Sequence, residues 1–182
     1  MPVWQRLVDT TGLDVVSIAV DMQGPDVVKP WTEAAGATFP TFVDTEARLA
    51  QDFGLAMVPT VFIVEERKVS IPPLRVDLLR DDNFEAVNAW ARGEAADLDL
   101  PPMPVADAST HRDKALAWLT VARLAFDEGR RADALESLER AYSLDPDNWL
   151  VRKQRWALEA PDKFYGADID FDWQAEQRAS GR

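Results

Sequence analysis

The stretch Met57-Val58-Pro59-Thr60-Val61-Phe62-Ile63-Val64 decides the fold of the first half of this chain. It joins an X-Pro step to a continuous apolar run that is rich in β-branched residues. Such a run predicts a strand at the centre of a sheet. We expect Lys68–Ile71 to pair back on this strand, and Pro72 and Pro73 to break the second strand because proline lacks an N–H donor.

Periodicity and breaker residues predict the elements around this stretch. Residues 13–20 form a near-continuous apolar run that predicts a strand covered on both faces. Asp26 and Thr45 are predicted to cap two helices, which Gly36 and Gly54 end. The full predicted order is a helix over 1–12, the strand over 13–20, a helix over 26–36, an extended piece over 39–44, a helix over 45–54, the hairpin, and a helix over 83–92.

Three local motifs carry a resemblance to a known family. Val58-Pro59-Thr60 precedes an apolar strand, Thr38-Phe39-Pro40-Thr41-Phe42-Val43-Asp44 leads into a helix, and Met1-Pro2-x-Trp4 opens the first helix. In this order they resemble the C-terminal part of the thioredoxin fold in the membrane-anchored TlpA/ResA group of thiol-disulfide oxidoreductases. The resemblance covers residues 1–93.

The resemblance implies a role for Val58, Pro59 and Thr60. In the family the proline of this signature is cis and faces the redox cysteines, where it leaves a backbone edge that pairs with an extended substrate peptide. We therefore expect these three residues to be the substrate-binding residues. The chain contains no cysteine, so we assign no catalytic residue, because thiol-disulfide exchange needs a thiolate.

The resemblance also implies that a strand is missing. In a thioredoxin sheet the strand before the Cys-x-x-C lies between the strands that match 13–20 and 60–64. Without it, two apolar strand edges are expected to be exposed, and self-association through them is possible. One expectation is that the natural product begins upstream of Met1 with this strand, a Cys-x-x-C or selenocysteine motif and a membrane anchor. The alternative is a degenerate paralogue that borrows a strand from a partner.

The last third of the chain predicts helices. Residues 94–110 have the Pro-, Asp- and Ala-rich composition of a linker. Ser109 or Thr110 is predicted to cap a helix that ends at Gly129, and helices over 131–143 and 148–160 follow. One tetratricopeptide repeat is predicted from the spacing of Trp118, Ala122, Gly129, Ala134, Leu138, Ala141 and Pro146.

These patterns predict a fold class and a domain division. The fold class is an incomplete α/β thioredoxin-like domain that lacks its first strands, followed by a small all-α TPR-like module. The predicted boundaries are a thioredoxin-like domain over 1–93, a linker over 94–110, a TPR-like hairpin with a third helix over 111–160, and an irregular tail over 161–182. One repeat does not form an independent peptide groove, so we expect the module to dock on the first domain or on a second copy.

Composition limits the partners. The net charge of −12 argues against nucleic acid and anionic membrane surfaces, and no apolar run approaches the roughly 18 to 20 residues of a spanning helix. The alternating Asp168, Asp170 and Asp172 lack the glycine and distal glutamate of a calcium loop, and His111 lacks a nucleophile partner. We expect no metal and no cofactor. The compartment is left open.

Two functions are predicted. The first is a protein related to thiol-disulfide oxidoreductases that is redox-inactive in the chain as given, because it has no cysteine. The alternative is a non-catalytic interaction module that holds a protein or peptide partner through the TPR-like tail and the Val58-Pro59-Thr60 edge. A peroxiredoxin-type peroxidase would also need a thiolate, and no residue argues for it.

Overall fold

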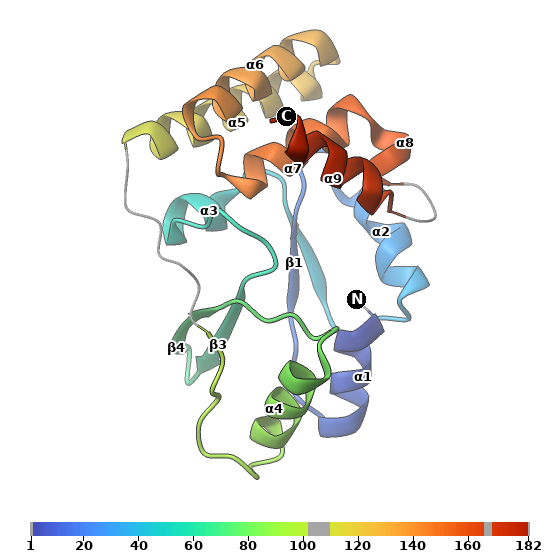
Figure 1. The fold of residues 1–182 in the computed structure, drawn as a ribbon, viewed down its shortest axis with the longest axis vertical. Coiled ribbons are helices and arrows are strands. Elements are labelled where there is room, and N and C mark those ends of the chain that lie inside the picture. Colours follow the sequence, from blue (N-terminus) through green and yellow to red (C-terminus); the bar gives the residue numbers. More distant parts are fainter. Residues whose placement is uncertain (1, 102–109, 166–168, 182) are drawn as a thin grey trace. The chain divides into compact units, whose positions relative to one another are not determined.

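The computed structural model describes residues 2–101, 110–165 and 169–181. The N-terminal part is a mixed α/β structure with small sheets, and the C-terminal region is all-helical (Figure 1). The predicted linker is described only in part, since residues 102–109, with the candidate cap Ser109, lie outside the described residues.

The N-terminal elements follow the predicted order (Figure 1). They are α1 (Pro2–Thr11), β1 (Ser17–Val20), α2 (Pro25–Ala34), β2 (Thr41–Asp44), α3 (Arg48–Phe53), β3 (Val61–Glu65), β4 (Lys68–Leu74) and α4 (Asp81–Ala91). A strand was predicted over 13–20, but β1 includes only the last four residues of this range. Asp26 lies inside the first turn of α2, which begins one residue earlier at Pro25.

The strands form two separate two-stranded sheets, β1–β2 and β3–β4. The prediction that 61–64 is a central strand is therefore wrong for the described residues, where the strand neighbour of β3 is β4. The prediction that the first strand is covered on both faces is also wrong, because none of the four residues of β1 is buried. The physical reason is the same in both cases: the described part of the chain supplies no strand between β1 and β3.

The β3–β4 hairpin is antiparallel and irregular, with Glu65 opposite Lys68. The strand β4 continues through Pro72 and Pro73, which the sequence predicted would break it. Both prolines lie between the pairs Val61–Leu74 and Ile63–Ile71, where the register shifts. Proline is tolerated at such irregularities and on edge strands, because no ladder hydrogen bond is required of its nitrogen there.

The core of the N-terminal part gathers around α1, α4 and the hairpin. Leu7 of α1 is completely buried, and Phe84 and Val87 of α4 pack in the same cluster. The other buried members are Ile63, Leu74, Val76 and Leu78. The inward face predicted for the helix over 83–92 is confirmed at Phe84 and Val87.

The cap of α3 falls on a different residue from the one predicted. The Asp44 carboxylate accepts hydrogen bonds from the backbone N–H groups of Arg48 and Leu49, at 3.0 Å each. It thus performs the capping predicted for Thr45. The helix ends at Gly54 with φ of 62°, as predicted, because a left-handed C-cap favours glycine.

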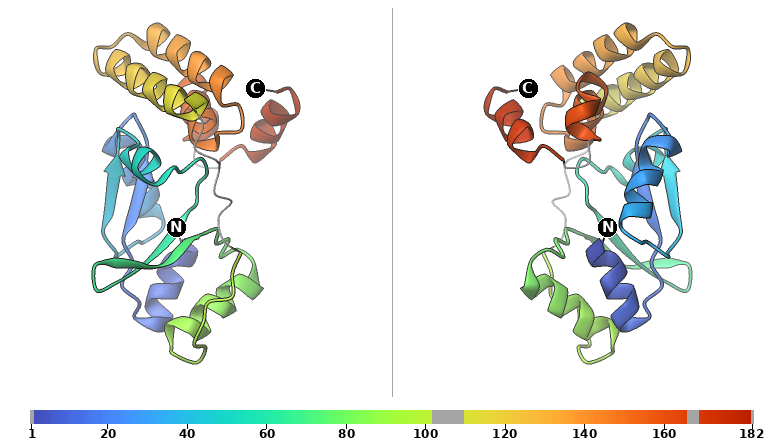
Figure 2. Two further views of the ribbon diagram at one scale, coloured as in Figure 1. Left: turned by 90° about the vertical axis from the view of Figure 1, so that its left-hand side faces the viewer. Right: turned by 90° about the vertical axis from the view of Figure 1, so that its right-hand side faces the viewer.

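The C-terminal region consists of α5 (Thr110–Asp127), α6 (Arg131–Leu144), α7 (Trp149–Glu159), α8 (Pro161–Phe164) and α9 (Phe171–Ala179). The helices α5 and α6 pack side by side as a hairpin (Figure 2). These two helices carry fully buried small residues, among them Ala122, Ala134 and Ala141, together with the fully buried Leu138. The helices predicted over this region are confirmed. Small side chains allow two helices to approach each other closely.

Two short helices occupy the segment for which the sequence predicted an irregular tail. Pro161 begins α8, and the Asp170 carboxylate caps α9 by accepting from the N–H of Trp173. The rings of Trp149 and Trp173 both lie edge-on to the buried Trp156, with centroids 6.2 and 5.9 Å away. The contact between Trp156 and Trp173 joins α9 to α7.

The described residues fall into two compact units that are interleaved along the chain. The first takes the described residues of 1–19, 28–43 and 58–105, and the second those of 20–27, 44–57 and 106–182. The turn after β1 and the segment around α3 therefore cluster with the C-terminal helices. Within the ranges that the structure describes, no helix is long and apolar enough to cross a membrane.

We predict that Leu138→Ala destabilises the protein by about 2 to 5 kcal/mol, since Leu138 is fully buried and truncation leaves a cavity beside α5. Leu124→Ala on α5, where the side chain is 56% exposed, is the matched control and should change stability by less than about 1 kcal/mol. Urea unfolding of both variants checks this, and equal effects would contradict the packing described for α6.

Candidate functional site

Val58, Pro59 and Thr60 lie in the irregular segment between α3 and β3. The Val58–Pro59 peptide bond is cis. The Pro59 ring is exposed, and Val58 and Thr60 are half-buried. Just before them, the carbonyl of Ala56 accepts a hydrogen bond from the N–H of Trp149 at 2.8 Å. The segment thus exposes a proline at the start of β3, with the chain before it held by α7.

The β1–β2 sheet displays apolar side chains to solvent. Ile18 of β1 is 45% exposed and Phe42 of β2 is 62% exposed. Val16, which leads into β1, is exposed as well. In the described part of the chain, β1 has β2 as its one strand neighbour. An apolar strand with one neighbour is a template for another extended segment.

The β3–β4 hairpin has an exposed apolar pair of its own. Val64 and Val69 are directly opposite each other in the register and are both largely exposed. Cross-strand pairs of β-branched residues stabilise a sheet, and when solvated they also offer a place for a further apolar layer. Both small sheets therefore carry uncovered apolar surface.

A buried polar cluster joins the turn after β1 to the segment after α8. The Tyr165 hydroxyl donates to Asp21 Oδ2 at 2.5 Å, and Gln23 Nε2 donates to the Tyr165 oxygen at 2.9 Å. The backbone N–H of Gln23 donates to Asp21 Oδ1 at 2.9 Å. The Asp21 carboxyl, with few solvent contacts, is thus satisfied by the protein on both oxygens.

Burial dominates the electrostatics of this cluster. Desolvation raises the pKa of Asp21, although its hydrogen bonds to Tyr165 and Gln23 oppose the shift. Desolvation also raises the pKa of Tyr165, and the neighbouring Asp21 charge adds to it. Tyr165 therefore stays protonated as a donor. The pair has the hydrogen-bonding pattern of a structural contact, because the two groups satisfy each other.

Gln154 of α7 completes the contact with the same turn. Its Nε2 donates to the carbonyl of Val20 at 2.9 Å, and its Oε1 accepts from the N–H of Met22 at 2.9 Å. The side chain is buried. The sequence did not predict that Gln154, Asp21 and Tyr165 come together. The available signal was Gln154 itself, a polar residue among the apolar residues of α7 such as Val151 and Trp156.

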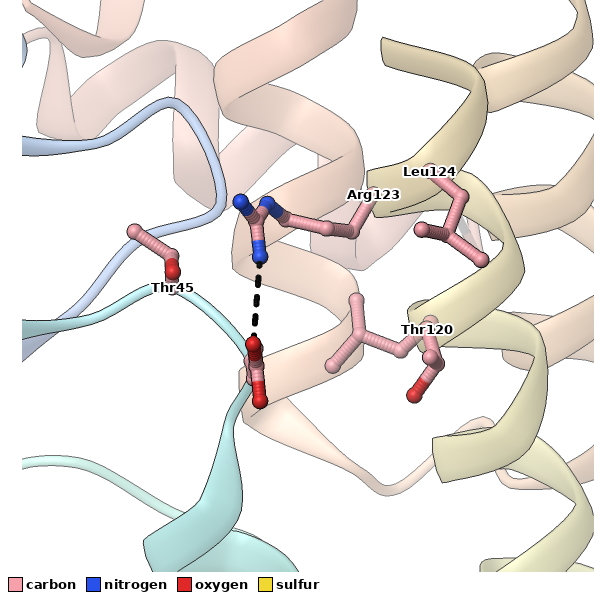
Figure 3. Close-up of a pocket in the computed structure, with 6 residues that line it drawn as sticks. Thr45, Thr120, Arg123 and Leu124 are labelled. Carbon is pink, nitrogen blue, oxygen red and sulfur yellow. Dashed lines mark ion pairs between the residues drawn. The ribbon is translucent and has the colours of Figure 1, made fainter. Parts of the chain in front are cut away.

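A small pocket lies between α5 and the residues before α3 (Figure 3). Arg123 points toward Glu46, with 3.8 Å between Nη1 and Oε1, and also pairs with Asp127 at 2.9 Å. The volume of about 60 Å³ is far below the roughly 300 to 1,000 Å³ of small-molecule sites. This pocket has room for a few water molecules rather than for a substrate.

The remaining candidates from the sequence do not come together. His111 is exposed in the first turn of α5. Asp170 caps α9 and pairs with Lys163 at 2.7 Å, Asp172 is exposed, and Asp168 lies outside the described residues. The described residues include no group of three or more His, Cys, Asp or Glu side chains that is placed to hold a metal ion.

We predict that Asp21→Asn gains stability relative to the wild type as the pH rises from about 4 to 7. A carboxyl whose folded pKa is raised above 3.8 contributes stability at low pH and loses it as the pH rises through the folded pKa. The variant has no such loss. Urea unfolding at a series of pH values measures the difference. Asp14→Asn, at an exposed position, is the control and should show no comparable trend; a parallel trend in both variants would contradict the burial of Asp21.

Comparison of the chain with protein-family models, with curated proteins and with solved structures found no match.

Proposed function

We propose that this chain is a thioredoxin-like protein related to the TlpA/ResA group of thiol-disulfide oxidoreductases, and that it binds an extended polypeptide without thiol chemistry. The order of α1, β1, α2, β2, α3, the Val58-Pro59-Thr60 segment, the hairpin and α4 supports the relationship. The absence of cysteine supports the redox-inactive part of the proposal, because the chain as given has no thiolate to exchange.

The single observation that carries the binding role is the separation of the two sheets. The strands β1 and β3 belong to different two-stranded sheets, and every residue of β1 is at least partly accessible. An extended polypeptide placed on the edge of β1 that faces away from β2 would form main-chain hydrogen bonds and cover Ile18. Burying one side chain of this size is worth about 1.5 to 3 kcal/mol.

The expected ligand is an extended segment with apolar side chains and little negative charge. The sheet offers backbone edges together with exposed Ile18 and Phe42, which favour β-branched and aromatic side chains opposite them. The chain carries a net charge of −12, which disfavours acidic segments. The same chemistry would permit self-association of two copies through β1.

The helical unit has a supporting role in this proposal. The sequence spacing of Ala122, Ala134 and Leu138 in the hairpin α5–α6 supports a helical unit of the tetratricopeptide type. One repeat does not make an independent peptide groove. We infer that these helices serve the polypeptide-binding role by holding segments of their own chain.

We predict that a fluorescein-labelled eight-residue peptide of alternating Val and Thr binds the purified full chain saturably. Ile18→Lys should weaken this binding at least about tenfold, or about 1.4 kcal/mol, because the charge replaces the apolar contact. Leu79→Lys adds the same charge at a residue that is 84% exposed and outside the strands, so this control should bind like the wild type. Fluorescence anisotropy is the measurement.

Two results would contradict this function. Failure of the wild type to bind the peptide would refute strand addition at β1. Equal weakening by Ile18→Lys and Leu79→Lys would show that net charge, rather than the β1 contact, governs binding.

A further inference from the structure

Helix α7 bonds to two main-chain segments that are far from it and from each other in sequence. At its first residue, the N–H of Trp149 donates to the carbonyl of Ala56. Halfway along, the amide of Gln154 bonds to Val20 and Met22. All of these residues belong to the same compact unit. One helix therefore holds both the turn that follows β1 and the segment that leads to Val58.

The Gln154 side chain forms these hydrogen bonds with main-chain groups, not with side chains. Its Nε2 donates to a carbonyl and its Oε1 accepts from an N–H two residues further on, at 2.9 Å each. This donor–acceptor pair is the one that a neighbouring strand supplies to an extended chain. Val20 is the last residue of β1. Gln154 thus continues the hydrogen bonding of β1 where the strand ends, and it does so from a buried position with 4% of its surface exposed.

The bond between Trp149 and Ala56 lies next to the cap of α7. Asn148 is fully buried, and its Oδ1 accepts from the N–H groups of Leu150 and Val151 at 3.1 and 3.3 Å. The first N–H groups of a helix have no partner inside the helix. The cap satisfies the second and third of them, and the carbonyl of Ala56 satisfies the first, that of Trp149.

The cluster around Tyr165 holds the same turn. Asp21 and Gln23 bond the Tyr165 hydroxyl, so consecutive residues of one turn are held from both α7 and the end of α8. Trp149 and Gln154 are five residues apart on α7, which corresponds to about 7.5 Å along the helix axis. The helix therefore sets the spacing between the two main-chain segments.

We propose that α7 is an internal brace that holds the end of β1 and the approach to Val58 at a fixed spacing. The brace itself rests on the hydrogen bonds of Gln154, Trp149 and Tyr165. Its consequence for ligand binding rests on the proposed function: opening the brace would release the end of the strand to which a polypeptide would add.

Hydrogen–deuterium exchange of the full chain, followed by mass spectrometry without any peptide, tests the brace. Gln154→Leu keeps the buried volume but removes both bonds. We expect peptides that cover 20–24 to exchange at least about tenfold faster, because the N–H of Met22 loses its acceptor. We expect peptides that cover Trp149 to exchange faster as well, because its N–H is the donor to the carbonyl of Ala56. Gln177→Leu on α9 is the matched control and should leave both regions unchanged.

Two outcomes would overturn the brace. Unchanged exchange at 20–24 would mean that Gln154 does not hold the turn, and faster exchange at 20–24 alone would mean that the two segments are independent. If Gln154→Leu also speeds exchange in α6, the substitution has disturbed more than the brace, and Gln154→Asn is used instead. This variant keeps the amide on a shorter side chain, and the same two outcomes would overturn the brace. Since no peptide is present, failure of the brace and failure of peptide binding are seen in different experiments.

Discussion

Every main-chain N–H and C=O group needs a hydrogen-bond partner, from the protein or from water, and the protein partners of β1 come from two distant parts of the chain. One edge of β1 pairs with β2, and its last residue is completed by the Gln154 side chain. The described part of the chain supplies no strand between β1 and β3, so Ile18 stays exposed. The bonds of Gln154 hold the turn after β1. An apolar strand of four residues cannot cover itself with side chains alone.

Local signals in the sequence predicted the order of elements well. Helix periodicity with buried Phe84, the glycine end of α3 and the small residues of the α5–α6 hairpin are all properties of short windows, and the structure has each of them. The same reasoning predicted that 13–20 is covered on both faces. Whether a strand is covered depends on which other strands lie beside it, and a stretch of eight residues does not contain this information.

The buried contacts of the turn after β1 could not be predicted from the sequence for a related reason. Asp21 appeared only as the residue that ends a strand, and Tyr165 lay in a stretch without periodicity. Their meeting depends on the fold of the residues between them. The capping of α3 shows a smaller version of this problem: Asp44 and Thr45 are both good capping residues, and it is Asp44 whose carboxylate reaches the N–H groups of Arg48 and Leu49. Proximity in space, rather than residue type, separates the right assignment from the wrong one.

The interleaving of the two units has a consequence for synthesis. The bonds that fix the turn after β1 join residues 132 to 144 positions apart. A ribosome makes Val20 and Asp21 long before Gln154 and Tyr165, so this turn has no lasting partner while most of the chain is being translated. Contacts of such high sequence separation form late and slowly.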